Sequence, residues 1–149
     1  MTQKKTKTRP RSPRKTPRPV ALPAVHEPSE QSRKIALYAA EAGLAKRASE
    51  VELIDVSGKV DYADYLVLMT GHSDRHVAAI ADGVDELLAR HGFRAASVEG
   101  LPHASWVLLD YIDVVVHVFR AESRSLYDLD GLWLDAHRLP LPEPNPNPA

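Results

Sequence analysis

The chain has 149 residues, of which 44% are hydrophobic, enough to bury the core of one ordinary domain. It contains no cysteine, which excludes disulfide bonds and thiolate metal sites. No apolar run approaches the roughly 20 residues that span a bilayer, and no apolar secretory segment follows Met1. We therefore expect a soluble, cytoplasmic protein without membrane contact.

The net charge of −1 is divided unevenly along the chain. Residues 1–19 hold eight of the 19 Lys and Arg residues and no Asp or Glu, which leaves eleven basic against 20 acidic residues elsewhere, a balance of −9. Residues 1–28 are rich in proline and poor in apolar side chains, which predicts a disordered basic tail. Three roles are open to it: a solvated arm, a contact with nucleic-acid phosphates, or a transit peptide, although it lacks the apolar face of such peptides.

The folded domain is predicted over residues 29–139, and it opens with a helix. Residues 30–48 are rich in Ala, Glu, Lys and Leu and follow Ser29, a good helix-capping residue. Residues 50–56 alternate between apolar and polar side chains, as a half-buried strand does. The apolar run 63–71 ends at a glycine and predicts a central strand that is buried on both faces.

A second helix is expected to begin after Ser73, its predicted N-cap, and to end at Gly92. Residues 94–100 form a short strand candidate. The apolar residues of the second helix keep helical spacing: Val77, Ile80, Ala81, Val84, Leu87 and Leu88.

The remaining segments complete one sheet. Residues 105–110 and 113–119 read as a hairpin that turns at Tyr111–Ile112, and residues 123–133 as a final short helix. The proline-rich residues 140–149 predict a second disordered tail. Because the last strands are expected to be antiparallel, the fold class is α/β, with a mixed sheet and helices packed on it.

The polar residues near these strands do not have the spacing of a metal site. Asp110 and Asp113 are three residues apart, whereas two-metal sites usually place carboxylates two apart on one strand face. His72 and His76 have a helical zinc-ligand spacing, but the cap at Ser73 leaves His72 off the helix and no third ligand follows. We therefore expect no metal, no cofactor and no enzymatic activity.

Three motifs occur in order along the domain: ADYLVLMTGHSDRHVAAIAD (63–82), WVLLDYIDVVVHVF (106–119) and ESRSLYDLDGLWLDA (122–136). Together they resemble the ribosomal silencing factor family, also called Iojap-related, over about residues 30–138. His72 and His76 replace the family's usual Asn and Gln, and Ile112 stands where the hairpin turn usually has Gly. Ile tolerates positive φ poorly, so this replacement disfavours the tight turn geometry that is usual in the family.

The resemblance implies a nucleotidyltransferase-like fold without the catalytic carboxylates. It also implies a protein that binds the large ribosomal subunit through its protein number fourteen. Bound there, family members block joining of the small subunit, which lowers translation when nutrients are scarce, and mitochondrial relatives assist large-subunit assembly. Bacterial members are often homodimers when free. An acidic domain suits a basic ribosomal protein, and the basic tail is a candidate for contact with ribosomal RNA.

The hairpin strands provide the candidate partner-binding residues. Trp106, Leu108 and Asp110 share one strand face, as do Asp113, Val115 and His117 on the next strand, so pairing of the strands would join them into one patch. One aromatic, two aliphatic and three polar side chains are typical of the centre of a protein interface. A core position for Trp106, a turn-forming role for Asp113 and a structural role for His117 are the alternatives.

A nucleotide-binding or nucleotidyltransferase enzyme is the rival interpretation. It would use Asp110, Asp113 and the strand-to-helix turn at Ser73, where a helix N-terminus can receive a phosphate. The turn lacks a glycine-rich loop and a nearby lysine, which disfavours this interpretation.

Three residues near the end of the domain are expected to pack the final helix on the sheet: Tyr127, Leu132 and Trp133.

Overall fold

The computed structural model describes residues 27–101 and 104–143, so most of the two predicted tails lies outside the described residues. Within these described ranges, six strands form one sheet in the order β4-β5-β6-β3-β2-β7. The strands are β2 (Ser49–Asp55), β3 (Tyr65–Gly71), β4 (Ser97–Glu99), β5 (Trp106–Asp110), β6 (Val114–Arg120) and β7 (His137–Leu139). The helices of the described part are α1 (Glu30–Ala45), α2 (Asp74–Arg90), α3 (Ala121–Tyr127) and α4 (Leu129–Leu132).

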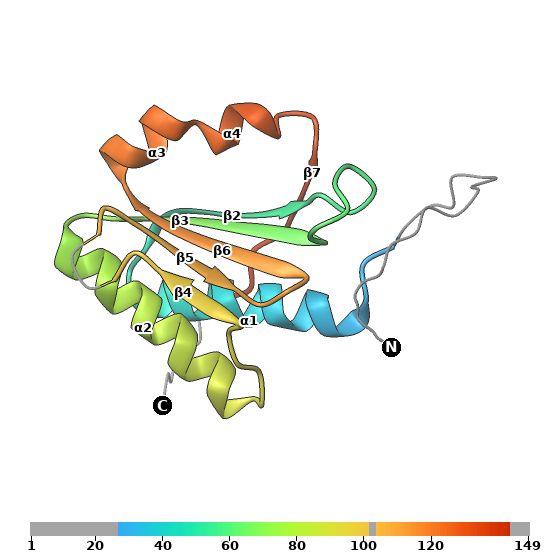
Figure 1. The fold of residues 1–149 in the computed structure, drawn as a ribbon, viewed down its shortest axis with the longest axis horizontal. Helices are drawn as coiled ribbons and strands as arrows, with labels where there is room; N and C mark the ends of the chain where they lie inside the picture. Colours follow the sequence, from blue (N-terminus) through green and yellow to red (C-terminus); the bar gives the residue numbers. More distant parts are fainter. Residues whose placement is uncertain (1–26, 102–103, 144–149) are drawn as a thin grey trace, which may run out of the picture.

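Helices lie on both faces of this sheet (Figure 1). α1 and α2 pack side by side on one face, and α3 with α4 lies on the other. β3 and β6 run parallel at the centre, while every other neighbouring pair is antiparallel. The predicted α/β class, with a mixed sheet and helices packed on it, is confirmed. None of the helices in the described ranges is long and apolar enough to cross a membrane.

Both long helices begin at the predicted caps. The side chain of Ser29 accepts a hydrogen bond from the backbone N–H of Ser32, and that of Ser73 accepts one from His76. A serine oxygen in this position satisfies one of the N–H groups that the first turn of a helix leaves without an intrahelical partner. The caps therefore fix where α1 and α2 start against the sheet.

Two cores form, one on each face of the sheet. All seven residues of β3 are buried, as the apolar run predicts. Its side chains alternate between the larger core under α1 and α2 and a smaller core on the opposite face. The smaller core consists of Ile54, Val56, Ala63, Leu66, Leu68, Val115, Phe119 and Ala136.

The end of the domain differs from the prediction. The expected single helix over residues 123–133 is two helices, because Asp128 adopts a left-handed conformation (φ 46°) between α3 and α4. The Asp128 side chain then accepts a hydrogen bond from the backbone N–H of Gly131 and caps α4. β7 was not predicted, since its three residues are too short for a periodicity signal; it pairs with β2 through Leu53 and Leu139.

The hairpin between β5 and β6 keeps a tight turn in spite of Ile112. The N–H of Tyr111 donates to the carbonyl of Val114 (2.9 Å), so the turn is centred on Ile112–Asp113, one residue later than predicted. Ile112 has φ 74°, and the N–H of Asp113 donates to the carbonyl of Tyr111 (3.0 Å), a rare and strained type of γ-turn. The carboxylate of Asp110 supports the turn by accepting from the N–H of Ile112 (2.8 Å).

Replacing Ile112 by glycine should stabilise the protein by about 1 kcal/mol. A β-branched residue at positive φ carries about 1–3 kcal/mol of strain, and glycine gives back part of the gain through the entropy of the unfolded chain. Urea denaturation of both proteins measures the difference. Ile112→Ala serves as the control, since it keeps Cβ and should show no comparable gain; a destabilised Ile112→Gly would mean that the turn is not strained at this residue.

Candidate partner-binding site

The side chains of β5 that point away from α1 and α2 are only partly covered. Trp106, Leu108 and Asp110 are half-buried, whereas Val107 and Leu109, between them in the strand, are fully buried in the larger core. This alternation follows from the two-residue period of a strand, one face of which packs on the helical layer. The exposed side of β5 therefore lies on the same face of the sheet as α3 and α4 (Figure 1).

The register of the hairpin brings five of the six predicted residues onto this face. Leu108 pairs with His117 and Asp110 with Val115, while Trp106 lies opposite Phe119. We call Trp106, Leu108, Asp110, Val115 and His117 the hairpin patch. Val115 and His117 are 9% and 7% exposed, so the accessible surface of the patch is provided by its three β5 residues.

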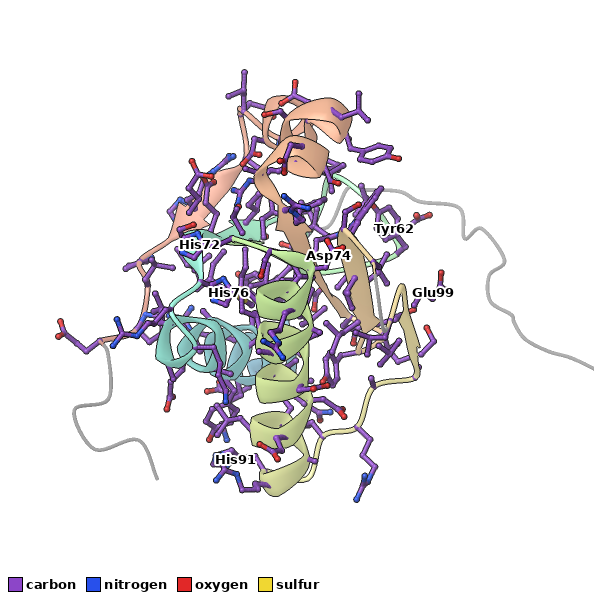
Figure 2. The ribbon with its side chains drawn as sticks, turned by 90° about the vertical axis from the view of Figure 1, so that its left-hand side faces the viewer. Tyr62, His72, Asp74, His76, His91 and Glu99 are labelled. Carbon is purple, nitrogen blue, oxygen red and sulfur yellow. The ribbon has the colours of Figure 1, made fainter. Side chains whose placement is uncertain are left out.

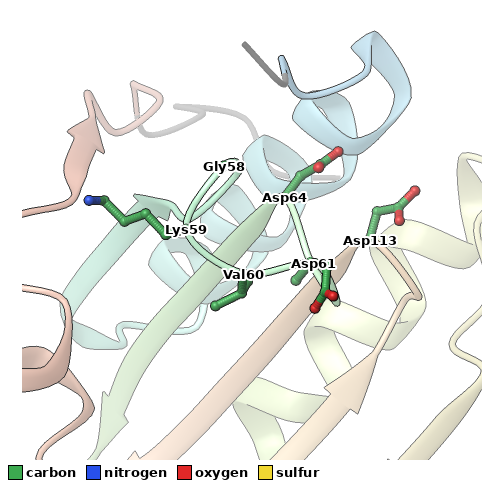
Figure 3. Close-up of a pocket in the computed structure, with 7 residues that line it drawn as sticks. Gly58, Lys59, Val60, Asp61, Asp64 and Asp113 are labelled. Atoms are coloured by element: carbon green, nitrogen blue, oxygen red, sulfur yellow. The ribbon is translucent and has the colours of Figure 1, made fainter. Parts of the chain in front are cut away.

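Asp113, the sixth predicted residue, lies apart from the patch in the turn. Its carbonyl accepts from the backbone N–H of Asp64 (2.7 Å), which ties the turn to the start of β3. Its side chain lines an open hollow of about 630 Å³ beside the loop at 58–64 (Figure 3). Asp64 also lines this hollow, but its carboxylate accepts from the hydroxyl of Ser32 (2.7 Å) and so holds the start of α1. These contacts are structural and assign no ligand to the hollow.

Trp106 is the centre of an aromatic cluster. Its indole N–H donates to Nδ1 of His117 (3.0 Å), and its ring lies 4.4 Å from that of Tyr127 and 5.2 Å from that of Phe119, measured between ring centroids. Such tilted ring pairs contribute about 0.5–1.5 kcal/mol beyond the area they bury. Trp106 thus packs on the smaller core and is also partly accessible. Its geometry is compatible with both roles considered from the sequence, a core position and a partner-binding position.

His117 is a neutral residue that supports Trp106. Burial lowers its pKa from 6.5 to about 4. Since Nδ1 accepts the indole N–H, the proton of the neutral ring lies on Nε2. The predicted structural role of this histidine is therefore supported by its geometry.

Tyr127 contacts the hairpin patch, although the sequence predicted only that it packs the final helix on the sheet. Its ring packs on Trp106, yet Tyr127 is 52% exposed. Trp133 packs on the smaller core as predicted, whereas the same prediction for Leu132 is wrong, since that side chain is 64% exposed. Leu126 in α3 and Leu134 after α4 are exposed as well, so the end of the domain presents several apolar side chains to solvent.

The residues of the rival enzyme site are not brought together. β3 and β6 are parallel, with Tyr65 paired to Val114 and Gly71 to Arg120. Ser73 therefore follows one end of the strand pair and Asp113 precedes the other, separated by about 20 Å of strand. The hydroxyl of Ser73 is engaged as the α2 cap.

His72 and His76 lie at the start of α2, with His91 at its far end (Figure 2). His76 uses both ring nitrogens within the chain: Nδ1 accepts from the N–H of His72 (2.8 Å), and Nε2 pairs with the carbonyl of Lys46 (2.8 Å). Within residues 27–101 and 104–143, no group of three or more His, Asp or Glu side chains is arranged to hold a metal ion.

Comparison with known proteins matches this chain to one family. The family model described as ribosomal silencing factor during starvation matches residues 29–149. The chain is 40% identical to the ribosomal silencing factor of Bacillus subtilis over 104 residues, which cover 70% of this chain and 88% of that protein. It is 43% identical to the ribosomal silencing factor of Zymomonas mobilis over 88 residues, 58% of this chain and 65% of that one. A crystal structure of a Chromobacterium violaceum protein superimposes with a TM-score of 0.67 at 30% identity, covering 76% of this chain and 89% of that one.

Proposed function

The chain is a member of the ribosomal silencing factor family, and from that membership we propose that it represses translation by blocking the joining of the ribosomal subunits. In this proposal the protein binds the large subunit through its protein number fourteen and occupies the face on which the small subunit would dock. Occlusion is steric, so no bond is made or broken and no catalytic residue is required. The place of action is the cytoplasm, and the free protein is a homodimer.

The observation that carries the proposal is the half-open hairpin patch, against which the exposed Tyr127 of α3 packs. Interface energy is usually concentrated in a few aromatic and arginine side chains near the centre of an apolar patch. Trp106 fits this role, with Leu108 and Asp110 beside it and Tyr127 against its ring. His117 and Val115 lie beneath and hold the accessible side chains in place.

Charge supports the same partner class. Outside residues 1–19 the chain holds 20 acidic residues and eleven basic ones. An excess of negative charge speeds encounter with a basic ribosomal protein through long-range attraction. Asp110 provides a carboxylate within the hairpin patch for a Lys or Arg of that partner.

Sedimentation of purified subunits tests this function. The full chain should co-migrate with isolated large subunits, and joined ribosomes should decrease when the protein is added before small subunits. The isolated small subunit serves as the control and should not carry the protein. Sedimentation of the protein alone at the top of the gradient, or unchanged subunit joining at saturating protein, would contradict the proposal.

The basic tail should add affinity for ribosomal RNA. Deleting residues 1–26 should weaken large-subunit binding a few-fold at low salt and make its salt dependence shallower, because fewer counterions are released from phosphates. The matched control keeps the tail length and replaces its eight Lys and Arg residues by Gln; it should behave like the deletion. If the full chain and the deletion variant bind equally at every salt concentration, the tail has no RNA role and is a solvated arm.

A further inference from the structure

Arg124 is a buried charge in a helix whose last three residues are exposed. The residue is 6% exposed, while Leu126 and Tyr127, which follow it in α3, are 75% and 52% exposed. Burying a guanidinium costs several kcal/mol unless its donors are paired. The donors of the buried guanidinium are therefore expected to have hydrogen-bond partners within the protein.

The guanidinium joins four segments of the chain. Nε and one terminal nitrogen donate to the two carboxylate oxygens of Asp130 (2.9 and 2.8 Å), a bidentate pair between α3 and α4. The other terminal nitrogen donates to the carbonyl of Glu50 in β2 (2.6 Å) and to the hydroxyl of Thr70 in β3 (2.9 Å). A carboxylate oxygen of Glu52 lies 3.8 Å away. The paired guanidinium in turn holds the pKa of Asp130 below its ordinary value.

Two unusual backbone conformations serve these contacts. Glu50 has φ 49° where the register of β2 shifts, and it presents its carbonyl to Arg124. Asp128 has φ 46° at the junction of α3 and α4, which turns the chain so that Asp130 reaches back to the same side chain. Left-handed backbone at residues other than glycine persists only where the surroundings fix it.

The junction held in this way carries the aromatic side chain that completes the candidate site. Tyr127 immediately precedes Asp128, and its ring packs on Trp106. We propose that Arg124 is a positioning residue of the partner-binding site: it fixes the α3–α4 junction so that Tyr127 stays over Trp106, without itself touching the partner. The effect on binding rests on the proposed function, whereas the effect on the ring contact does not.

The test compares Arg124→Gln with Arg120→Gln in the full chain. Both variants remove one positive charge near α3, but Arg120 is partly exposed and pairs with Asp74 and Glu122. Nuclear Overhauser contacts between the rings of Tyr127 and Trp106 report the junction, and large-subunit binding reports function. Arg124→Gln should lose the ring contact and about tenfold or more in affinity, roughly 1.4 kcal/mol. Arg120→Gln should keep the contact and bind within about twofold of the parent chain.

Amide hydrogen exchange separates positioning from general stability. In Arg124→Gln, protection should fall in α3 and α4 while β3 and β6 stay protected, since only the junction is released. Should this variant fail to fold, Arg124→Lys decides, because it keeps the charge but cannot form the bidentate fork; it should also lose the ring contact. An intact ring contact in Arg124→Lys, or in a folded Arg124→Gln, would overturn the proposal. If the parent chain does not bind large subunits, the proposed function fails while the ring contact still decides the role of Arg124.

Discussion

Under the proposed function, replacing Trp106 by alanine should weaken binding to isolated large-subunit protein number fourteen by about 30-fold. Truncating a central aromatic side chain of an interface typically costs about 2 kcal/mol or more, and about 1.4 kcal/mol corresponds to a factor of ten. The substitution removes the accessible indole, its ring contact with Tyr127 and the hydrogen bond to His117. The block on subunit joining should be released in parallel, because occlusion depends on occupancy.

Affinity from titration calorimetry must be read beside the melting temperature, since Trp106 also packs on the smaller core. Trp106→Phe keeps an aromatic ring but removes the indole N–H, and should bind more tightly than Trp106→Ala. Trp133, the second of the two tryptophans, is the matched control. It packs on the same core from the end of α4, so Trp133→Ala should lower the melting temperature with little effect on affinity. The reverse pattern, with Trp133→Ala folded but unable to bind, would place the partner surface on α4.

The elements with strong local signals were predictable from the sequence. α2 has a serine cap, six apolar residues at helical spacing and a terminating glycine, and these signals act within a few residues of one another. β3 is an unbroken apolar run that suits only a strand buried on both faces. The five residues of the hairpin patch could be predicted to share a face, because side chains alternate along β5 and β6. The place of Asp113 among them was wrong, since the turn lies one residue later than predicted and includes Asp113.

The features that were missed depend on contacts between distant residues. The break at Asp128 lies beside Arg124, which bonds Asp130 and two strands that precede it by more than fifty residues. The contact of Tyr127 with Trp106 likewise needs α3 to be folded back over the sheet. The wide separation of Ser73 from Asp113 follows from the parallel direction of β3 and β6, which periodicity does not reveal.

His117 should make the protein less stable at mildly acidic pH than at neutral pH. The side chain is 7% exposed, and its Nδ1 accepts the indole N–H of Trp106, a donor that excludes a proton on that nitrogen. Protonation of the folded state therefore costs both desolvation and this hydrogen bond, which agrees with a pKa of about 4. In the unfolded chain the same residue has its ordinary pKa of 6.5.

Between these two pKa values the unfolded chain takes up a proton that folded His117 does not, so the free energy of unfolding decreases as the pH falls. The contribution of His117 is complete above about pH 6.5 and should drop by about 2–3 kcal/mol between pH 7.5 and 4.5, since one pKa unit corresponds to about 1.4 kcal/mol. Urea denaturation at the two pH values measures it. His117→Gln is the control, because its amide oxygen can accept the indole N–H but does not titrate, and contributions from the other acidic and histidine residues cancel between the two proteins. Equal losses of stability in the parent chain and in His117→Gln would show that His117 titrates normally in the folded protein and that its ring is open to water.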